Sequence, residues 1–293
     1  MTKTILTSLI AAVLAAVVTV KVVVPESSNG VITERQESTY ERVMRTGKLR
    51  CGYNFYEPGF VKDEETGEFY GLYYDLLEAV GKVADIEIEW SALVGWGNMV
   101  TDIEAEKVDA FCISVWPNAL RGKRLLFSDS FLYVNVEAYA RAEDERFKTG
   151  DLSRVNSEDV TIAVLDADIS DEIAKNEFPK AKKSTVTTLG SDADLFNELK
   201  FGKADVTFTT HSIFIGYDKK NPNILRRLSP ENPLRTFGTT IALSMGEHDL
   251  KAMLDSAIEQ LVNSGDVKRI LQKYENNYPD TFFQVAKPYE ELN

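Results

Sequence analysis

Short apolar segments typical of β-strands alternate with amphipathic segments typical of helices along most of this chain. The predicted strands cover residues 49–53, 86–90, 108–114, 136–141, 161–164, 185–187, 205–209 and 239–244. The predicted helices cover residues 74–83, 97–106, 171–176, 192–201, 248–264 and 267–278, and another helix begins at Thr39 and stops at Gly47. Strands that are separated by helices are typical of parallel sheets with helices on both faces. The sequence therefore predicts an α/β fold.

Two segments of similar sequence indicate that this plan occurs twice. Residues 107–110 read Lys-Val-Asp-Ala, residues 203–206 read Lys-Ala-Asp-Val, and each segment follows an amphipathic helix. The chain has 293 residues, of which 44% are hydrophobic, and this is enough for two separate cores. We therefore expect two lobes of similar architecture.

Several function classes lack their usual signals. The net charge of −13, from 46 acidic and 33 basic residues, argues against nucleic acid or an anionic membrane surface as the main partner. No His/Cys cluster has metal-ligand spacing, and no phosphate-binding loop or dinucleotide fingerprint is present. His211 has no obvious Ser or Cys partner, and His248 lies at a predicted helix start. We expect no catalytic residue, no metal and no cofactor.

The N-terminal residues form a separate segment. An almost uninterrupted apolar run extends from residue 5 to residue 20 and is typical of a signal peptide or a short membrane anchor. Neither a small-x-small cleavage site nor a lipid-accepting cysteine follows, which slightly favours an anchor, residues 1–24, over a cleaved signal peptide. Residues 25–38 are polar, contain Pro, Gly and Ser, and predict a tether. Both alternatives imply export.

The segment from residue 107 to residue 130 carries the strongest indication of a binding site. An apolar strand leads into a polar loop that contains Arg121, and a second extended run, residues 125–128, follows. Ligands of open α/β sheets bind at such strand ends, and the planar guanidinium group suits a carboxylate. Taken alone, Arg121 has the alternative interpretation of an ordinary surface arginine.

Several weak motifs occur in a specific order. They are Gly-Lys-Leu-Arg-Cys-Gly-Tyr at 47–53, Gly-Leu-Tyr-Tyr-Asp-Leu at 71–76, the two Lys-x-Asp segments, and Arg121 followed by Phe-Ser-Asp at 127–129. Together they resemble the extracytoplasmic solute-binding proteins of the polar amino-acid uptake family, from about Tyr40 to the C-terminus. The resemblance implies the two-lobed type II periplasmic-binding-protein fold, with a two-strand hinge and a ligand cleft between the lobes.

The resemblance also implies a domain organisation and a function. Lobe one would contain residues 39–138 and 239–293, lobe two would contain residues 142–236, and solute binding would close the cleft. The chain would capture a small polar solute, an amino acid or a related carboxylate or zwitterion, and deliver it to an ABC-type membrane permease. It would be a periplasmic or extracytoplasmic monomer, attached to the inner membrane if residues 1–24 are retained.

The expected cleft residues of lobe one are carried over from the family. Only Trp96 and Arg121 match its usual residue types, and Phe55 and Tyr56 lie beside a departed aromatic position where they could provide a stacking face. Trp96 has the alternative of a core aromatic residue, whereas Trp116 is expected to form an exposed stacking surface. The implied set is Asn54, Phe55, Tyr56, Glu57, Trp96, Ser114, Trp116, Asn118 and Arg121.

Lobe two departs further from the family. Asp168 replaces part of a Gly-Thr turn, and Thr210, preceded by Thr209, stands where the family usually has an aspartate for the solute's ammonium group. Asp168 could hold a cation in place of that aspartate while Arg121 holds an anion. The alternative is that Asp168 caps the helix that follows it. An ordinary α-amino acid is therefore a weaker prediction than the fold alone suggests.

Two other function classes remain open. An enzyme of this fold, similar to a periplasmic cyclohexadienyl dehydratase, would need a carboxylate for proton transfer, and Glu57 or Asp168 could serve. A receptor would use the same binding domain for sensing, but the sequence shows no signalling domain. We expect capture and no enzymatic activity.

The cysteines leave a structural alternative. Cys51 and Cys112 are the only two, and both lie in predicted strands of lobe one. Export permits a disulfide, but the geometry between adjacent strands is often unfavourable for that bond. Two buried free thiols are the preferred prediction.

Overall fold

The computed structural model describes residues 37–166, 168–186 and 192–284. The predicted signal peptide or anchor, residues 1–24, and residues 25–36 of the predicted tether lie outside the described residues. Within the described ranges, no helix has both the length and the apolar composition that crossing a membrane requires.

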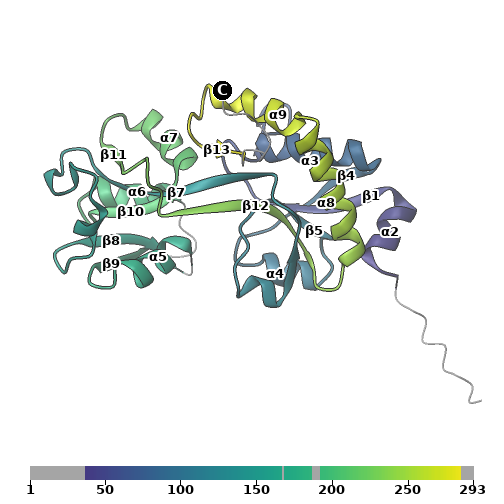
Figure 1. Cartoon of the computed structure of the whole chain (residues 1–293), viewed down its shortest axis with the longest axis horizontal. Helices are drawn as coiled ribbons and strands as arrows, with labels where there is room; N and C mark the ends of the chain where they lie inside the picture. Colours follow the sequence, from purple (N-terminus) through teal and green to yellow (C-terminus); the bar gives the residue numbers. More distant parts are fainter. Residues whose placement is uncertain (1–36, 167, 187–191, 285–293) are drawn as a thin grey trace, which may run out of the picture. The chain divides into compact units, whose positions relative to one another are not determined.

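Figure 1 labels the main elements of the described residues. The α-helices are α2 (Thr39–Thr46), α3 (Leu72–Ala84), α4 (Met99–Glu104), α5 (Ile169–Glu177), α6 (Asp192–Lys200), α7 (His211–Lys220), α8 (His248–Asn263) and α9 (Asp266–Glu275). The strands are β1 (Lys48–Tyr53), β2 (Val61–Lys62), β3 (Phe69–Tyr70), β4 (Glu87–Leu93), β5 (Ala110–Val115), β6 (Leu125–Phe127), β7 (Leu132–Arg141), β8 (Thr161–Leu165), β9 (Lys182–Val186), β10 (Val206–Thr210), β11 (Leu225–Leu228), β12 (Arg235–Ser244) and β13 (Phe282–Phe283). Three short 3₁₀ helices are η1 (Arg121–Lys123), η2 (Glu145–Phe147) and η3 (Leu152–Val155).

Most of the described strands belong to one sheet. Its order is β4-β1-β5-β12-β7-β10-β8-β9, with β6 paired to β12 and with β11 and β13 paired to β7. Pairing is parallel between β1 and its neighbours β4 and β5, and between β8 and its neighbours β9 and β10. The strands in the middle of the order pair antiparallel. The predicted α/β class with parallel regions is confirmed.

Strands β7 and β12 join the two parallel regions. Each has ten residues, and they run side by side and antiparallel (Figure 1), from the pair Leu132 and Thr239 to the pair Val136 and Arg235. The side chains of Leu132 and Val134 belong to one hydrophobic core, whereas Val136 belongs to another. The structure therefore has the predicted two lobes joined by two strands. The residue limits predicted for each lobe stay a prediction.

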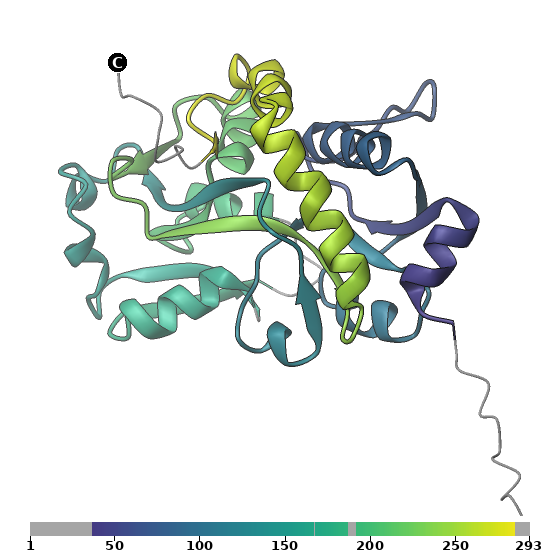
Figure 2. The ribbon, with the colours of Figure 1, turned by 45° about the vertical axis from the view of Figure 1, so that its right-hand side comes forward.

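Each lobe has its own core. In lobe one, α3 and α8 lie side by side (Figure 1, Figure 2) and share a core with α9 and β1. In lobe two, alternate residues of β8 point to opposite faces, as in any strand. Ile162 and Val164 join a cluster with Ile173 of α5, and Ala163 joins a cluster with Leu195 of α6. Helices therefore cover both faces of this parallel region.

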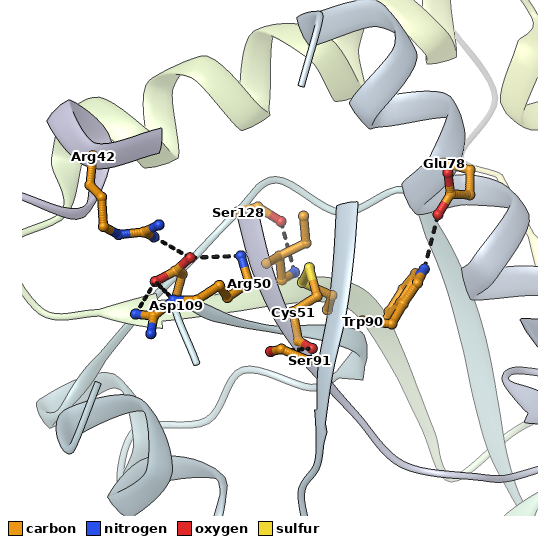
Figure 3. Close-up of a disulfide and its surroundings, with 10 residues drawn as sticks. Arg42, Arg50, Cys51, Glu78, Trp90, Ser91, Asp109 and Ser128 are labelled. Carbon is orange, nitrogen blue, oxygen red and sulfur yellow. Dashed lines mark hydrogen bonds and ion pairs between the residues drawn. A yellow bond between two sulfur atoms is a disulfide. The ribbon is translucent and has the colours of Figure 1, made fainter. Parts of the chain in front are cut away.

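The two Lys-x-Asp segments have the same structural role. Asp109 accepts hydrogen bonds from the backbone N–H of Arg50 (2.6 Å) and from its guanidinium group (3.0 and 2.7 Å), and it also pairs with Arg42 (Figure 3). Asp205 accepts from the backbone N–H of Thr161 (2.9 Å) and from two arginine side chains. Each carboxylate thus ties the start of one strand to its parallel neighbour.

The two cysteines form a disulfide, so the preferred prediction of free thiols is wrong. Cys51 on β1 lies opposite Ala110 of the parallel neighbour β5, and Cys112 is the next β5 residue on the same face. The bond forms because these residues are diagonal neighbours, with Cα atoms 5.5 Å apart, which is within the range that a disulfide spans (Figure 3). Both cysteines are fully buried in the core of lobe one.

Some elements differ from their predicted limits. β7 begins at Leu132 and β12 at Arg235, because their first residues pair with each other across a long sequence separation. β9 begins at Lys182, before the predicted residue 185. Helix α7 is absent from the sequence prediction, because its sequence HSIFIGYDKK combines β-branched and aromatic residues without a clear helical period.

Candidate functional site

Loops at the carboxyl ends of three parallel strands bring most of the predicted lobe-one residues to one edge of the sheet. Residues 54–57 follow β1, Trp96 follows β4, and residues 116–121 follow β5, while Ser114 lies on β5 itself. Parallel strands end at the same edge, which is where ligands of α/β sheets bind. The structure therefore supports one site in lobe one from three separate segments.

Arg121 is held by its own loop. Its backbone N–H donates to the side-chain oxygen of Asn118 (2.8 Å), and its Nη1 donates to the carbonyl oxygen of Trp116 (3.0 Å). Asn118 is exposed and acts here as a turn residue. These two bonds close the loop and set the direction of the guanidinium group.

The guanidinium group of Arg121 keeps donors for an anion. Burial lowers its pKa, the Asp168 carboxylate opposes that shift, and an arginine stays charged in any case. The group has five N–H bonds, and in the part of the chain that the structure describes it forms no ion pair with a carboxylate. A partly buried cation that forms no ion pair within the described residues is a suitable site for a solute carboxylate.

Trp116 directly follows β5 and packs where the two lobes meet. Its ring stacks on Phe237 of β12, with centroids 4.8 Å apart and planes 2° from parallel. The indole packs against the cores of both lobes, so one face is covered and the residue is less open than expected. Its Nε1 is buried and has no hydrogen-bond partner within the described residues.

Phe55 and Tyr56 in the loop after β1, together with Trp96 after β4, form an aromatic group. Trp96 is 43% exposed and Phe55 is 41% exposed, so neither is a core residue. The Trp96 ring lies 6.2 Å from the ring of Tyr56 and 5.3 Å from that of Phe111. Exposed aromatic faces at this edge of the sheet can stack against a solute.

The two polar residues of this loop have structural partners. Asn54 Nδ2 donates to the carbonyl oxygen of Val94 (3.1 Å), which ties the loop after β1 to the end of β4. Glu57 Oε1 accepts a hydrogen bond from the Tyr278 hydroxyl (2.6 Å). A cavity of about 620 Å³ lies beside this loop, lined by Phe55, Tyr56, Glu57, Phe60, Val61, Lys62, Asp63, Glu64 and Gly67.

Helix α3 positions the same loop. The backbone N–H groups of Leu72 and Tyr73 donate to the carbonyl oxygens of Pro58 and Gly59, at 2.9 and 2.8 Å. Gly71, before the helix, has a φ of 126°, and a Cβ there would lie 2.6 Å from the Gly59 oxygen. The glycine of the Gly-Leu-Tyr-Tyr-Asp-Leu motif is therefore required for this close approach.

Ser114 lies near two buried tyrosines, Tyr56 and Tyr73. It has a positive φ of 32° at the end of β5. Burial raises the pKa of Tyr73, and the nearby hydroxyls of Ser114 and of Thr239 on β12 oppose that rise. Burial also raises the pKa of Tyr56 well above its ordinary value. These phenols therefore stay protonated, and the Tyr73 hydroxyl is buried without a hydrogen-bond partner in the described residues.

Asp168 caps helix α5, as the alternative interpretation proposed. Its Oδ1 accepts from the backbone N–H of Ser170 (3.1 Å) and from the Ser170 hydroxyl (3.0 Å). Its charge nevertheless acts on Arg121. The capping role and a role toward a solute cation are compatible, since a carboxylate can accept several hydrogen bonds.

The two threonines lie at the end of β10. Both are buried, and Thr210 Oγ1 lies 3.2 Å from the hydroxyl of Ser212, at the start of α7. Their predicted contact with the solute stays a prediction.

Sequence reasoning missed some residues at this site. Phe237 lies in the segment predicted for the return crossing, but nothing in the sequence pairs it with Trp116. Tyr278 lies at the end of the last predicted helix and carries no local signal for its contact with Glu57. In the described part of the chain, no group of three or more His, Cys, Asp or Glu side chains could hold a metal ion.

Comparisons with known proteins agree with this architecture. The sequence model described as "Bacterial extracellular solute-binding proteins, family 3" matches residues 49–277. A Bacillus subtilis (strain 168) protein named "Probable amino-acid-binding protein YxeM" is 20% identical over 215 residues, which is 73% of this chain and 78% of that protein.

Solved structures share the fold. The ancestral amino acid-binding protein AncCDT-1, a precursor of cyclohexadienyl dehydratase, has a TM-score of 0.66 and 22% identity, over 82% of this chain and 99% of that one. An amino acid ABC transporter substrate-binding protein from Streptococcus pneumoniae, bound to L-arginine, has a TM-score of 0.65 and 18% identity, over 84% and 98%. The predicted two-lobed type II fold is confirmed.

Proposed function

This chain belongs to the bacterial extracellular solute-binding proteins of family 3, and from that premise we propose that its solute is an amino acid or a related small carboxylate. As a member of this family it binds a solute outside the cytoplasm. The proposed solute is delivered to an ABC-type membrane permease. The names of its relatives, which include amino-acid-binding proteins, support this class of solute.

The observation that carries the proposal is the state of Arg121. Its guanidinium group is partly buried, is positioned by its own loop, and forms no ion pair with a carboxylate in the described residues. A charged group in such a place is stabilised when a solute anion pairs with it. The exposed rings of Trp96 and Phe55 would then cover the body of the solute.

The proposed mechanism is closure of the two lobes. The two strands β7 and β12 form the connection, and a rotation about them would bring the N-terminal end of α5, in lobe two, toward Arg121. A solute that contacts both lobes favours the closed state by its differential affinity for that state. In this scheme, Arg121 of lobe one holds the carboxylate and Asp168 of lobe two holds a cationic group of the solute.

The proposal includes no enzymatic step. The sequence offers Glu57 and Asp168 for proton transfer, and both carboxylates hold hydrogen bonds within the protein, to Tyr278 and to Ser170. A binding protein needs no further group. We also propose that the protein is a monomer and that residues 1–24, if retained, attach it to the inner membrane.

The test is solute binding by Arg121→Ala. A thermal-shift screen of the wild type with amino acids, amines and small carboxylates identifies a solute by its stabilising effect, and calorimetry then gives its affinity. Loss of the guanidinium group should weaken binding by about 2–5 kcal/mol if the ion pair is desolvated on closure.

A nearby arginine is the matched control. Arg124 has a side chain that is 51% exposed and pairs with Glu104. The variant Arg124→Ala should bind the solute like the wild type, because this pair lies on the surface. Wild-type affinity in Arg121→Ala would disprove the proposed carboxylate site.

A further inference from the structure

The chain returns to the hinge after its last helix. We call residues 278–283 the C-terminal strap. Its strand β13 pairs with β7, where Phe282 lies opposite Val134 and Phe283 lies opposite Tyr133. The same two β7 residues pair with Phe237 and Gly238 of β12 on the other edge. The connection between the lobes is therefore three-stranded at this point, in the order β12-β7-β13.

One side chain of the strap contacts both lobes. The Tyr278 hydroxyl donates to Glu57 Oε1 of lobe one (2.6 Å), and Lys219 Nζ of α7 in lobe two lies 4.5 Å from the centroid of the Tyr278 ring. Tyr278 is 5% exposed. Burial and the Glu57 carboxylate raise the pKa of Tyr278, so the hydroxyl keeps the proton that it donates.

A second residue of the strap faces a charge of lobe two. Asp280 lies 4.0 Å from Nη1 of Arg227 on β11. Arg227 in turn forms a two-point ion pair with Glu137, a buried residue of β7. The strap therefore meets lobe two through the ring of Tyr278 and through the carboxylate of Asp280.

These contacts reach the loop after β1, which supplies several of the predicted site residues. Glu57 follows Phe55 and Tyr56, the aromatic residues of the loop after β1, and it lines the cavity beside that loop. The hydrogen bond from Tyr278 fixes the Glu57 side chain of this loop, while the Lys219 ammonium group of the other lobe packs over the ring of the same tyrosine. A relative movement of the lobes changes the distance between Glu57 and Lys219, and Tyr278 lies between them.

We propose that the C-terminal strap is a latch between the lobes, with Tyr278 as a positioning residue that prepares the site loop for the solute. This inference rests on the proposed function. Tyr278 contacts no solute; it holds the lobe arrangement and the loop in which Phe55 and Tyr56 meet the solute. When a latch is released, a smaller fraction of the protein is in the binding-competent state, and the apparent affinity falls by that fraction.

The variant Tyr278→Phe removes only the hydroxyl group. We expect solute affinity to fall by about five- to tenfold, as loss of one part-buried hydrogen bond to a charged group would produce. Glu57→Gln and Lys219→Met should weaken binding in the same direction, and the double variant Glu57→Gln/Lys219→Met should weaken it less than the two effects combined. Tyr40→Phe, in α2, is the matched control and should bind like the wild type.

The effect of Lys219, which lies in the other lobe, distinguishes a latch between the lobes from a contact that only supports the loop after β1. If Tyr278 only supported its own loop, Lys219→Met would leave the affinity unchanged, and this result would overturn the proposal. Unchanged or tighter binding by Tyr278→Phe would also overturn it. An Arg121-dependent solute together with an unaffected Tyr278→Phe variant would disprove the latch and leave the proposed function intact.

A measurement without solute tests the latch by itself. Hydrogen–deuterium exchange of the wild type and of Tyr278→Phe compares the loop at residues 54–57 with the end of α7 at residues 217–220. Release of the latch should speed exchange in both segments, which belong to different lobes. Equal exchange in the two proteins would overturn the proposal even if no solute had been found.

Discussion

Opening the Cys51–Cys112 disulfide is predicted to destabilise lobe one strongly. The bond links β1 to β5 across a sequence separation of 61 residues, and both cysteines are fully buried. In the folded protein the sheet already holds these strands together through β1–β5 pairing. The effect of the bond therefore lies mainly in the unfolded chain, whose freedom it restricts.

The loop length sets the magnitude. For a separation of 61 residues, the chain-entropy relation gives about 14 cal/mol/K, which is about 4 kcal/mol at 25 °C. A domain has a total stability of about 5–15 kcal/mol, so reduction should remove a large part of it. The variant Cys51→Ala/Cys112→Ala should lose slightly more, because it also removes two buried sulfur atoms from the core.

The assay is urea unfolding of three samples: oxidised wild type, reduced wild type and the double alanine variant. Alkylation followed by mass measurement counts the free thiols in each, with none expected in the unreduced wild type. The reduced wild type keeps both sulfur atoms in the core and isolates the effect of the covalent bond. Equal unfolding free energies for the oxidised and reduced wild type would refute the chain-entropy argument, and two free thiols in the unreduced native protein would refute the disulfide.

Two further predictions concern buried charges. The pKa of His211 is lowered from 6.5 to about 4, mainly by burial and further by the Arg227 cation, while Asp280 has a smaller opposing effect. The folded state therefore favours the neutral imidazole. Its contribution to the unfolding free energy is complete above pH 6.5 and is lost as the pH falls toward 4, by up to about 3 kcal/mol. The variant His211→Gln should lack this part of the pH dependence in urea unfolding, and parallel pH profiles of the variant and the wild type would contradict the assignment. Asp109→Asn leaves Arg42 and Arg50 without their shared carboxylate, whose side chain is 1% exposed, and should cost about 2–4 kcal/mol in unfolding free energy. Glu104→Gln, which breaks an exposed pair, should cost less than about 1 kcal/mol, and similar losses for the two variants would show that burial of the Asp109 pair has no role.

The predicted fold follows from local patterns. Apolar strand segments and amphipathic helices show in short windows of sequence, and the structure has β1, β5, β8 and β10 close to their predicted places. The two Lys-x-Asp segments are an example, because Asp109 and Asp205 occupy the same place in the motif and both accept a hydrogen bond from a backbone N–H group of the neighbouring strand. The glycine at residue 71 is a similar case, since its φ of 126° needs glycine.

The candidate site was predictable only in part. The position of Arg121 after an apolar strand indicates a binding loop, and the structure shows how Asn118 and Trp116 hold it. The double role of Asp168, as a helix cap and as a charge that acts on Arg121, could not be separated in the sequence. Both functions use the same residue type at the same place, before a helix.

The sequence by itself determined the α/β class, the two-lobed plan, the membership of a solute-binding family and the place of Arg121, because these depend on periodicity and on short motifs. Only the tertiary structure decided which distant groups meet. Cys51 bonds to Cys112 because β1 and β5 are neighbours. Tyr278 reaches Glu57 across a sequence separation of 221 residues because the chain returns to the hinge after its last helix. Such contacts depend on the path of the whole chain, and the sequence of a short segment does not indicate which distant residue it will contact.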